Sequence, residues 1–300
     1  MISKEMQAVI NVLQKGKDST PADLTAEMMR KGFEQMAALN RPPDKGVYKP
    51  DTLAGVPVEW VAFPEAPANR IMLYLHGGAY AAGSMNTHRN LCGRLAKATE
   101  MTVLMVDYRL APENPFPAAL EDAVAVYRCL IAEKDIKPAD MVIAGDSAGG
   151  GLTLATMLKL KETGEPLPRA AVCMSPWTDL ALTGETIKTK AEDDPFLIAE
   201  AIGRFAGLYL NGEDAKNPMA SPLYGDLSGL PPLLIQVGDR ECLLDDSRRL
   251  AERAKAADVP VKLETWEGMV HVFQIFAGIA TESARAIENI AEFLKSEMTS

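Results

Sequence analysis

Ser147 stands between glycines in the segment 145–150, which reads Gly-Asp-Ser-Ala-Gly-Gly. Glycines on either side permit a tight turn that leaves a serine hydroxyl exposed, where it can act as a nucleophile. The segment before it, 141–144, is short and apolar, and 152–158 after it has a helical pattern. The sequence therefore predicts a strand, a sharp turn and a helix, with Ser147 at the turn. The alternative is a glycine-rich loop that only reverses the chain.

A nucleophilic serine needs a neighbouring base, and His271 is the only histidine that follows Ser147 in the chain. His271 comes just after the strand-like segment 261–266, so we expect it beyond the carboxyl end of that strand. In α/β sheets with a nucleophile turn, the chain order is serine, acid, histidine. The position and the order together predict that His271 is the base.

The acid is expected after the strand-like segment 233–237, where four carboxylates follow: Asp239, Glu241, Asp245 and Asp246. Asp245 and Asp246 fit solvated or capping positions at the start of the next helix, where negative charge is favourable. Asp239 and Glu241 remain as candidates for the triad acid, and spacing alone does not choose between them.

An acyl-transfer site also needs hydrogen-bond donors for the oxygen that becomes negative. Gly77 and Gly78 follow the strand-like segment 70–75 and have no side chain to obstruct their N–H groups. Together with Ala148 they predict an oxyanion hole of three main-chain donors. We expect His76 to brace this loop through a hydrogen bond. The alternative is a tight turn chosen for its shape.

Strand-like segments alternate with helical periods through most of the chain, which predicts an α/β fold with a mostly parallel sheet and helices on both faces. Active sites of such sheets lie beyond the carboxyl ends of the strands, where Ser147 is expected. The strand-like segments are 56–63, 70–75, 101–106, 141–144, 170–174, 233–237 and 261–266. The helical periods are 87–99, 117–133, 148–163, 244–257 and 281–297.

Two parts of the chain depart from this alternation. Amphipathic helices are expected at 3–15 and 22–39, followed by an irregular connection over 40–55. The stretch 183–224 holds a helical segment, 196–210, with no strand beside it. We interpret these parts as a lid over the strand ends.

The composition excludes several classes of protein. A formal charge of −10 argues against nucleic acid as a partner, because binding phosphates requires clustered Lys and Arg. No run of eighteen apolar residues is present, so no membrane span is expected. The first residues lack the apolar core of a secretory signal, and the four cysteines are scattered. We therefore expect a cytoplasmic protein with reduced thiols and no metal site.

Taken together, these residues resemble the hormone-sensitive-lipase family of α/β-hydrolases, and in particular its small bacterial esterases (bacterial family IV). The resemblance covers nearly all of the chain from about residue 55. It implies N-terminal cap helices at 1–50, an α/β-hydrolase core at 51–182 and 225–300, and a cap insertion at 183–224. The segments that carry it are 76–80, 107–113, 116–119, 145–150, 175–179, 221–222, 230–232 and 269–273.

The resemblance also favours Glu241 as the acid. The family usually has Asp-Pro-Leu-x-Asp after this strand, and 241–245 matches it with Glu in the catalytic position and Cys242 in place of proline. Because Cys242 departs from the pattern, Asp239 stays as a weaker candidate. Ala79 stands where the family usually has a third glycine, but the first two glycines are expected to supply the donors.

The expected activity is hydrolysis of short-chain acyl esters by a Ser-His-Glu triad through an acyl-enzyme, without a metal or organic cofactor. One alternative is an amide or formamide hydrolase on the same site. Another is a small-ligand receptor like the plant gibberellin receptors, in which the catalytic histidine is replaced. A homodimer through the edge strand 261–266 is possible in such a family. The residues expected to contact the substrate are Tyr80, Met28, Met29, Phe33, Phe205 and Leu208.

Overall fold

The computed structural model of the protein describes residues 2–38, 40–64, 66–67 and 69–299. Its centre is an eight-stranded sheet in the order β1-β2-β4-β3-β5-β6-β7-β8. The two pairs that involve β2 are antiparallel and the other five pairs are parallel. The strands are β1 Val47–Leu53, β2 Val56–Ala62, β3 Ile71–Leu75, β4 Thr102–Val106, β5 Met141–Asp146, β6 Ala170–Met174, β7 Leu233–Gly238 and β8 Val261–Trp266.

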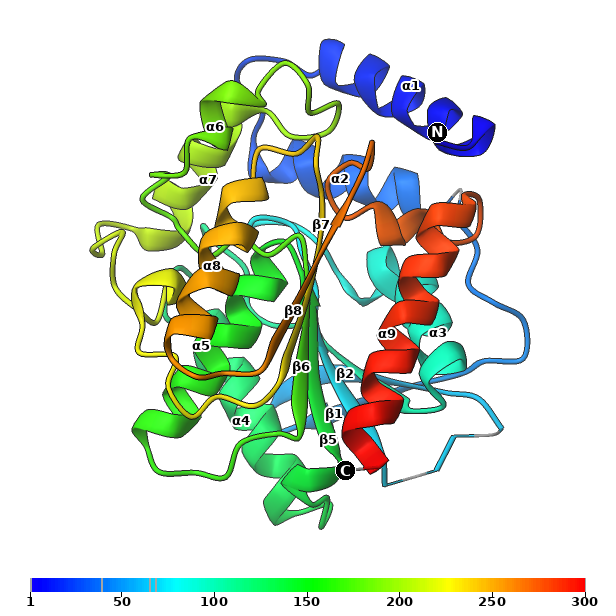
Figure 1. The fold of residues 1–300 in the computed structure, drawn as a ribbon, viewed down its shortest axis with the longest axis vertical. Coiled ribbons are helices and arrows are strands. Elements are labelled where there is room, and N and C mark those ends of the chain that lie inside the picture. The colour runs from blue at the N-terminus through cyan, green and yellow to red at the C-terminus, as the bar shows by residue number, and fades with distance from the viewer. Residues whose placement is uncertain (1, 39, 65, 68, 300) are drawn as a thin grey trace.

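Helices cover both faces of the sheet. In Figure 1, α3 and α9 lie on one side and α4, α5 and α8 on the other. The central strands read as continuous apolar runs because both of their faces are buried: Leu73 packs in one core and its neighbours Met72 and Tyr74 in the other. The predicted α/β fold is confirmed, with each predicted strand ending within two residues of its observed bounds. The covering helices are α3 Met85–Thr99, α4 Ala118–Ala132, α5 Ala148–Glu162, α8 Leu244–Ala256 and α9 Thr281–Thr299, and short 3₁₀ helices span Pro138–Asp140, Pro222–Tyr224 and Phe273–Phe276.

The irregular connection expected over 40–55 is wrong in its second half. Residues Val47–Leu53 form β1, which pairs antiparallel with β2. The strand was not predicted because Pro50 lacks an N–H and usually argues against a strand. Proline is tolerated at the edge of a sheet, and β1 is an edge strand. The sheet therefore begins inside the segment assigned to the N-terminal cap.

The remaining helices gather at one end of the molecule, at the top of Figure 1. They are α1 (Lys4–Asp18), α2 (Ala26–Ala38), α6 (Thr186–Thr189) and α7 (Ala199–Leu210). The helix predicted over 22–39 starts four residues later, and its last predicted residue, Leu39, lies outside the described residues. No helix in the described part of the chain is both long and apolar enough to cross a membrane.

Candidate active site

Ser147 forms the turn between β5 and α5 with φ 51° and ψ −121°, a left-handed conformation that is strained for a residue with a side chain. The turn is tight because a Cβ on Gly149 would collide with the carbonyl of Leu75, and one on Gly145 with the carbonyl of Gly149. The Ser147 N–H donates to the carbonyl of Met174 at 2.9 Å, which anchors the strained residue to β6. The predicted strand, turn and helix are all present.

His271 lies between Ser147 and a carboxylate. Its Nε2 is 2.9 Å from Ser147 Oγ, and its Nδ1 is 2.5 Å from Glu241 Oε2. The three side chains come from the ends of β5, β7 and β8, and all three are buried. The hydroxyl can therefore pass its proton to Nε2 while the carboxylate holds the ring and its tautomer.

The two candidate acids have separate contacts. The second oxygen of Glu241 accepts the N–H of Gly238 at 3.0 Å, so the carboxylate is fixed from the end of β7. Asp239 instead accepts the N–H of Gly268 at 2.8 Å and braces the loop that leads to His271. Of the two, Glu241 is the one in contact with the imidazole.

The charges around His271 set its basicity. Burial lowers the pKa of His271, but the Glu241 carboxylate raises it, helped by Asp194 and Asp146, and the net shift is upward from 6.5. Burial likewise raises the pKa of Glu241, and the contact with His271 opposes that shift. The site is therefore arranged to stabilise an imidazolium.

The N–H of Gly77 does not face the site. It donates to the buried carboxylate of Asp146 at 3.0 Å, so its assignment to the oxyanion hole is corrected. Among the hydrogen bonds of the described residues, none uses the N–H groups of Gly78, Ala79 or Ala148. The first two follow β3 and the third opens α5, where the helix dipole favours negative charge. These three groups are available for an oxyanion.

Asp146 supports this loop from beneath. It accepts hydrogen bonds from Tyr74 Oη at 2.7 Å, and His88 Nε2 lies 3.4 Å away. Burial raises the pKa of Asp146, but His88 and these hydrogen bonds outweigh it and the net shift is downward. His76 Nδ1 donates to the carbonyl of Gly77 at 2.8 Å, which is the bracing contact expected of it. The sequence did not predict this role of Asp146, because the motif that contains it points only to Ser147.

Two further polar residues hold the loop after β6 in place. Ser175 Oγ accepts the N–H of Val272, next to His271, at 3.0 Å. Asp246, expected to be solvated or capping, is buried, and it accepts the N–H groups of Thr178 and Asp179 at 2.7 and 2.9 Å. Burial raises the pKa of Asp246 to about 7. Asp246 therefore ties α8 to the β6 loop.

Two stacked aromatic pairs join the helices α2 and α7 and the neighbouring loops, and one of them includes a ring next to His271. Tyr80, just after the oxyanion loop, stacks on Tyr209 of α7 with ring centroids 3.7 Å apart. Phe33 of α2 stacks on Phe196 at 6.4 Å, and Phe196 lies 6.0 Å from the ring of His271. Phe33 thus reaches the triad through Phe196, which no sequence motif marks.

The other expected substrate contacts divide into two groups. Met29 and Phe205 pack in a small apolar cluster that joins α2, α7 and the loop after β3. Met28 and Leu208 are 43% and 36% exposed and lie outside this cluster, so their assignment to the pocket lining stays a prediction. Each is one residue from an inward position, and one residue turns the side chain about 100° around a helix axis. On α7 that inward position is Tyr209.

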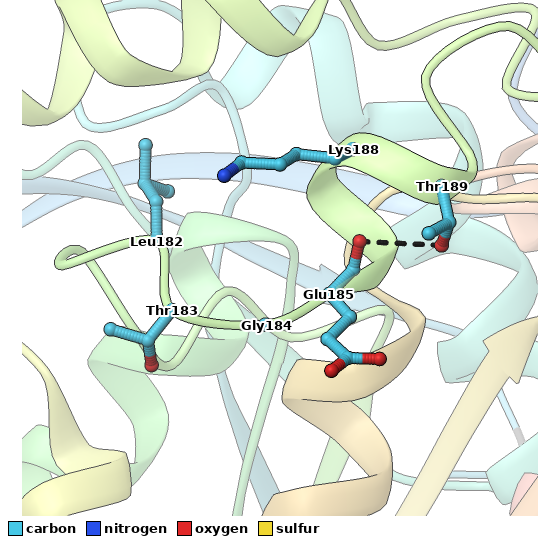
Figure 2. Close-up of a pocket in the computed structure, with 6 residues that line it drawn as sticks. All are labelled: Leu182, Thr183, Gly184, Glu185, Lys188 and Thr189. Atoms are coloured by element: carbon cyan, nitrogen blue, oxygen red, sulfur yellow. Dashed lines mark hydrogen bonds between the residues drawn. The ribbon is translucent and has the colours of Figure 1, made fainter.

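A surface hollow near α6 is separate from the triad. Figure 2 shows its lining, with Leu182 and Lys188 on one side and Thr183 on another. The Oγ1 of Thr189 donates to the carbonyl of Glu185 at 3.2 Å, which closes the short helix on itself. None of the residues that line it belongs to the Ser147–His271–Glu241 cluster.

Comparison with known proteins places the chain in a family. The family described as α/β hydrolase fold matches residues 72–275. An acetyl-hydrolase from Streptomyces hygroscopicus is 47% identical over 81% of each chain. An esterase from Acinetobacter venetianus is 40% identical over 95% of this chain and 94% of its own.

Solved structures agree closely with this one. A crystal structure of an esterase from the bacterial hormone-sensitive lipase family has a TM-score of 0.95 and 46% identity over 99% of both chains. EstE5, soaked with p-nitrophenyl butyrate, has a TM-score of 0.94 and 42% identity over 99% of this chain and 100% of its own. The chain is therefore a carboxylic ester hydrolase that belongs to the bacterial hormone-sensitive-lipase family of α/β-hydrolases.

Proposed function

We propose that the protein is a serine carboxylesterase that hydrolyses short-chain acyl esters through an acyl-enzyme on Ser147. The observation that carries the proposal is the buried, continuous contact from Glu241 through His271 to Ser147, with 2.9 Å between the histidine and the serine oxygen. This is the arrangement that activates a serine at neutral pH.

In the first step, His271 Nε2 takes the hydroxyl proton as Ser147 Oγ bonds to the ester carbonyl carbon. The carbonyl oxygen becomes negative and accepts hydrogen bonds from Gly78, Ala79 and Ala148. The bond to the alcohol oxygen then breaks, and the alcohol leaves with the proton from His271. The acyl group remains on Ser147.

In the second step, His271 removes a proton from water as the water oxygen bonds to the acyl carbon. The same three donors stabilise the negative oxygen. The bond to Ser147 Oγ breaks, the serine recovers its proton from His271, and the carboxylic acid departs. Glu241 stabilises the imidazolium in both steps.

The preference for short acyl chains is supported by the ring of Phe196, which lies 6.0 Å from that of His271 and restricts the space beside the base. The related esterase EstE5 was soaked with p-nitrophenyl butyrate, an ester whose acyl group has four carbons. The same ester is the natural first substrate to test here.

The test is a series of p-nitrophenyl esters from acetate to palmitate, with wild-type protein and Ser147→Ala. We expect the highest kcat/KM at short acyl chains and loss of turnover in Ser147→Ala at an unchanged melting temperature. Ser228→Ala, on an exposed loop, is the matched control. Activity retained in Ser147→Ala contradicts the mechanism, and a maximum at myristate or longer contradicts the size preference. The matching p-nitroanilides separate ester from amide hydrolysis.

A further inference from the structure

Asp194 is a fully buried carboxylate in the cap, in the connection between α6 and α7. One of its oxygens accepts the N–H groups of Phe196 and Leu197, each at 2.9 Å, which forms the turn that leads into α7. The other oxygen accepts the N–H of Cys242 at 2.8 Å. A charged group without exposure needs such partners, and three main-chain donors supply them.

Cys242 directly follows Glu241, so this hydrogen bond joins the cap to the loop that carries the triad acid. The main chain of the same cap segment is held from another side. Lys17, near the end of α1, donates to the carbonyls of Asp194 and Ala191, both at 2.6 Å. Three segments far apart in the sequence therefore meet at Asp194.

The segment that Asp194 begins also touches the base. Phe196, whose N–H Asp194 accepts, places its ring 6.0 Å from that of His271. Asp194 thus contacts the acid loop through one oxygen and orients a neighbour of the base through the other. A turn alone needs only the oxygen that faces Phe196 and Leu197; the second oxygen serves the acid loop.

We propose that Asp194 is a positioning residue for hydrolysis: it holds the Glu241 loop in register with His271 and fixes the cap insertion on that loop. The proposal rests on the proposed function, because it assigns Asp194 an effect on that same reaction. Asp194 touches neither the substrate nor Ser147, so it acts through Glu241 and His271.

The charge of Asp194 also affects the pKa of His271, so its removal should change the pH dependence of hydrolysis. The charged groups that act on His271 are Glu241 from the β7 loop, Asp146 from β5 and Asp194 from the cap, with Lys17 beside Asp194. Burial lowers the pKa of His271, and the three carboxylates raise it. Removing the Asp194 charge therefore lowers this pKa, so the acid limb of kcat/KM moves to lower pH.

The first experiment compares Asp194→Asn with Asp193→Asn on p-nitrophenyl butyrate. Asp193 is the adjacent exposed carboxylate, so both variants lose one charge at nearly the same place. Asparagine keeps one acceptor but turns its amide toward main-chain N–H groups on the other side. For Asp194→Asn we expect kcat to fall about tenfold, KM to change little, and the acid limb to move to lower pH. Asp193→Asn is expected to match the wild type.

A second pair of variants keeps the charge and removes the hydrogen bond. Cys242→Pro introduces the residue that the family usually has at this position and eliminates the N–H that Asp194 accepts in this chain. Cys242→Ala retains that N–H, and both variants lose the thiol. We expect kcat to be lower in Cys242→Pro than in Cys242→Ala. This pair decides the question if Asp194→Asn fails to fold, as judged by its melting curve.

The proposal is overturned if folded Asp194→Asn equals Asp193→Asn in both kcat and acid limb. It is also overturned if the two Cys242 variants have equal kcat. The proposed function fails separately, when the wild type has no Ser147-dependent esterase activity. The two failures are therefore distinguishable.

Discussion

The loops that follow β5, β7 and β8 bury their reactive side chains, whereas several apolar side chains of the cap are partly exposed to solvent. Ser147, Glu241 and His271 are each at most 9% exposed, and His271 contacts both of the others. Met28 and Leu208, from the cap helices, have no comparable burial. Strand ends fix the chemistry through main-chain geometry, and the cap is held by a few side-chain contacts. Substitutions of the strand-end side chains should therefore act on turnover, and substitutions of the half-exposed apolar side chains of the cap on stability or binding.

The largest contrast lies within the strand-end loops themselves. Glu241→Gln keeps the size of the side chain but removes the charge that stabilises the imidazolium, so kcat should fall by about 10⁴-fold, as for amide replacement of a triad acid. Asp239→Asn alters only the brace to Gly268 and should cost less than about tenfold. Steady-state kinetics on p-nitrophenyl butyrate measures both. A larger loss in Asp239→Asn would reverse the assignment of the acid.

Within α7, the neighbours Tyr209 and Leu208 should differ strongly in their effect on stability. Tyr209→Ala removes a buried ring that stacks on Tyr80, and should lower the free energy of unfolding by about 3 kcal/mol. Leu208→Ala truncates an exposed side chain and should change it by about 0.5 kcal/mol or less. Urea denaturation measures both values. Equal losses would mean that the two faces of α7 are packed alike.

The pH dependence of kcat/KM reports the pKa of His271, which the surrounding charges and burial set. The base acts in its neutral form, and the net shift of the His271 pKa is upward from 6.5. The acid limb of kcat/KM should therefore have its midpoint above pH 6.5, with activity falling about tenfold per pH unit well below it. A midpoint below 6.5 would mean that burial outweighs the neighbouring carboxylates.

A small effect is expected at the surface link between cap and core. Arg30 of α2 pairs with Glu113 at 2.6 Å, and a hydrogen bond from Arg30 lowers the pKa of Glu113 to about 2. Glu113 is 58% exposed, so solvent screens the pair, and Glu113→Gln should destabilise by at most about 1 kcal/mol. The difference should shrink in molar salt. Thermal melts with and without salt check it.

The sequence predicted that Ser147 and His271 lie together, and the structure places them in contact. This was predictable because each follows a strand-like segment and His271 is the only histidine after Ser147. The acid needed the family resemblance, since Asp239 and Glu241 lie two residues apart. The glycine content could not predict that the N–H of Gly77 is already used, because this depends on its hydrogen bond to Asp146.

Long-range contacts explain most of what was missed. Asp194 and Cys242 are 48 residues apart, and nothing in the local pattern of either predicts their hydrogen bond. Phe196 was expected inside a helix, but Asp194 accepts its N–H and delays the start of α7 to Ala199. Such contacts follow from the packing of distant segments, which hydrophobic periodicity does not encode.

The two free borders of the sheet are unequal, and this limits how copies of the protein can associate. Pro50 interrupts the main-chain donors along β1, so a further strand cannot add there with a complete ladder. Only β8, at the opposite border, keeps a regular strand without proline. The predicted homodimer would therefore join the two sheets through β8. A single usable border gives a closed two-fold pair and not an open-ended fibre.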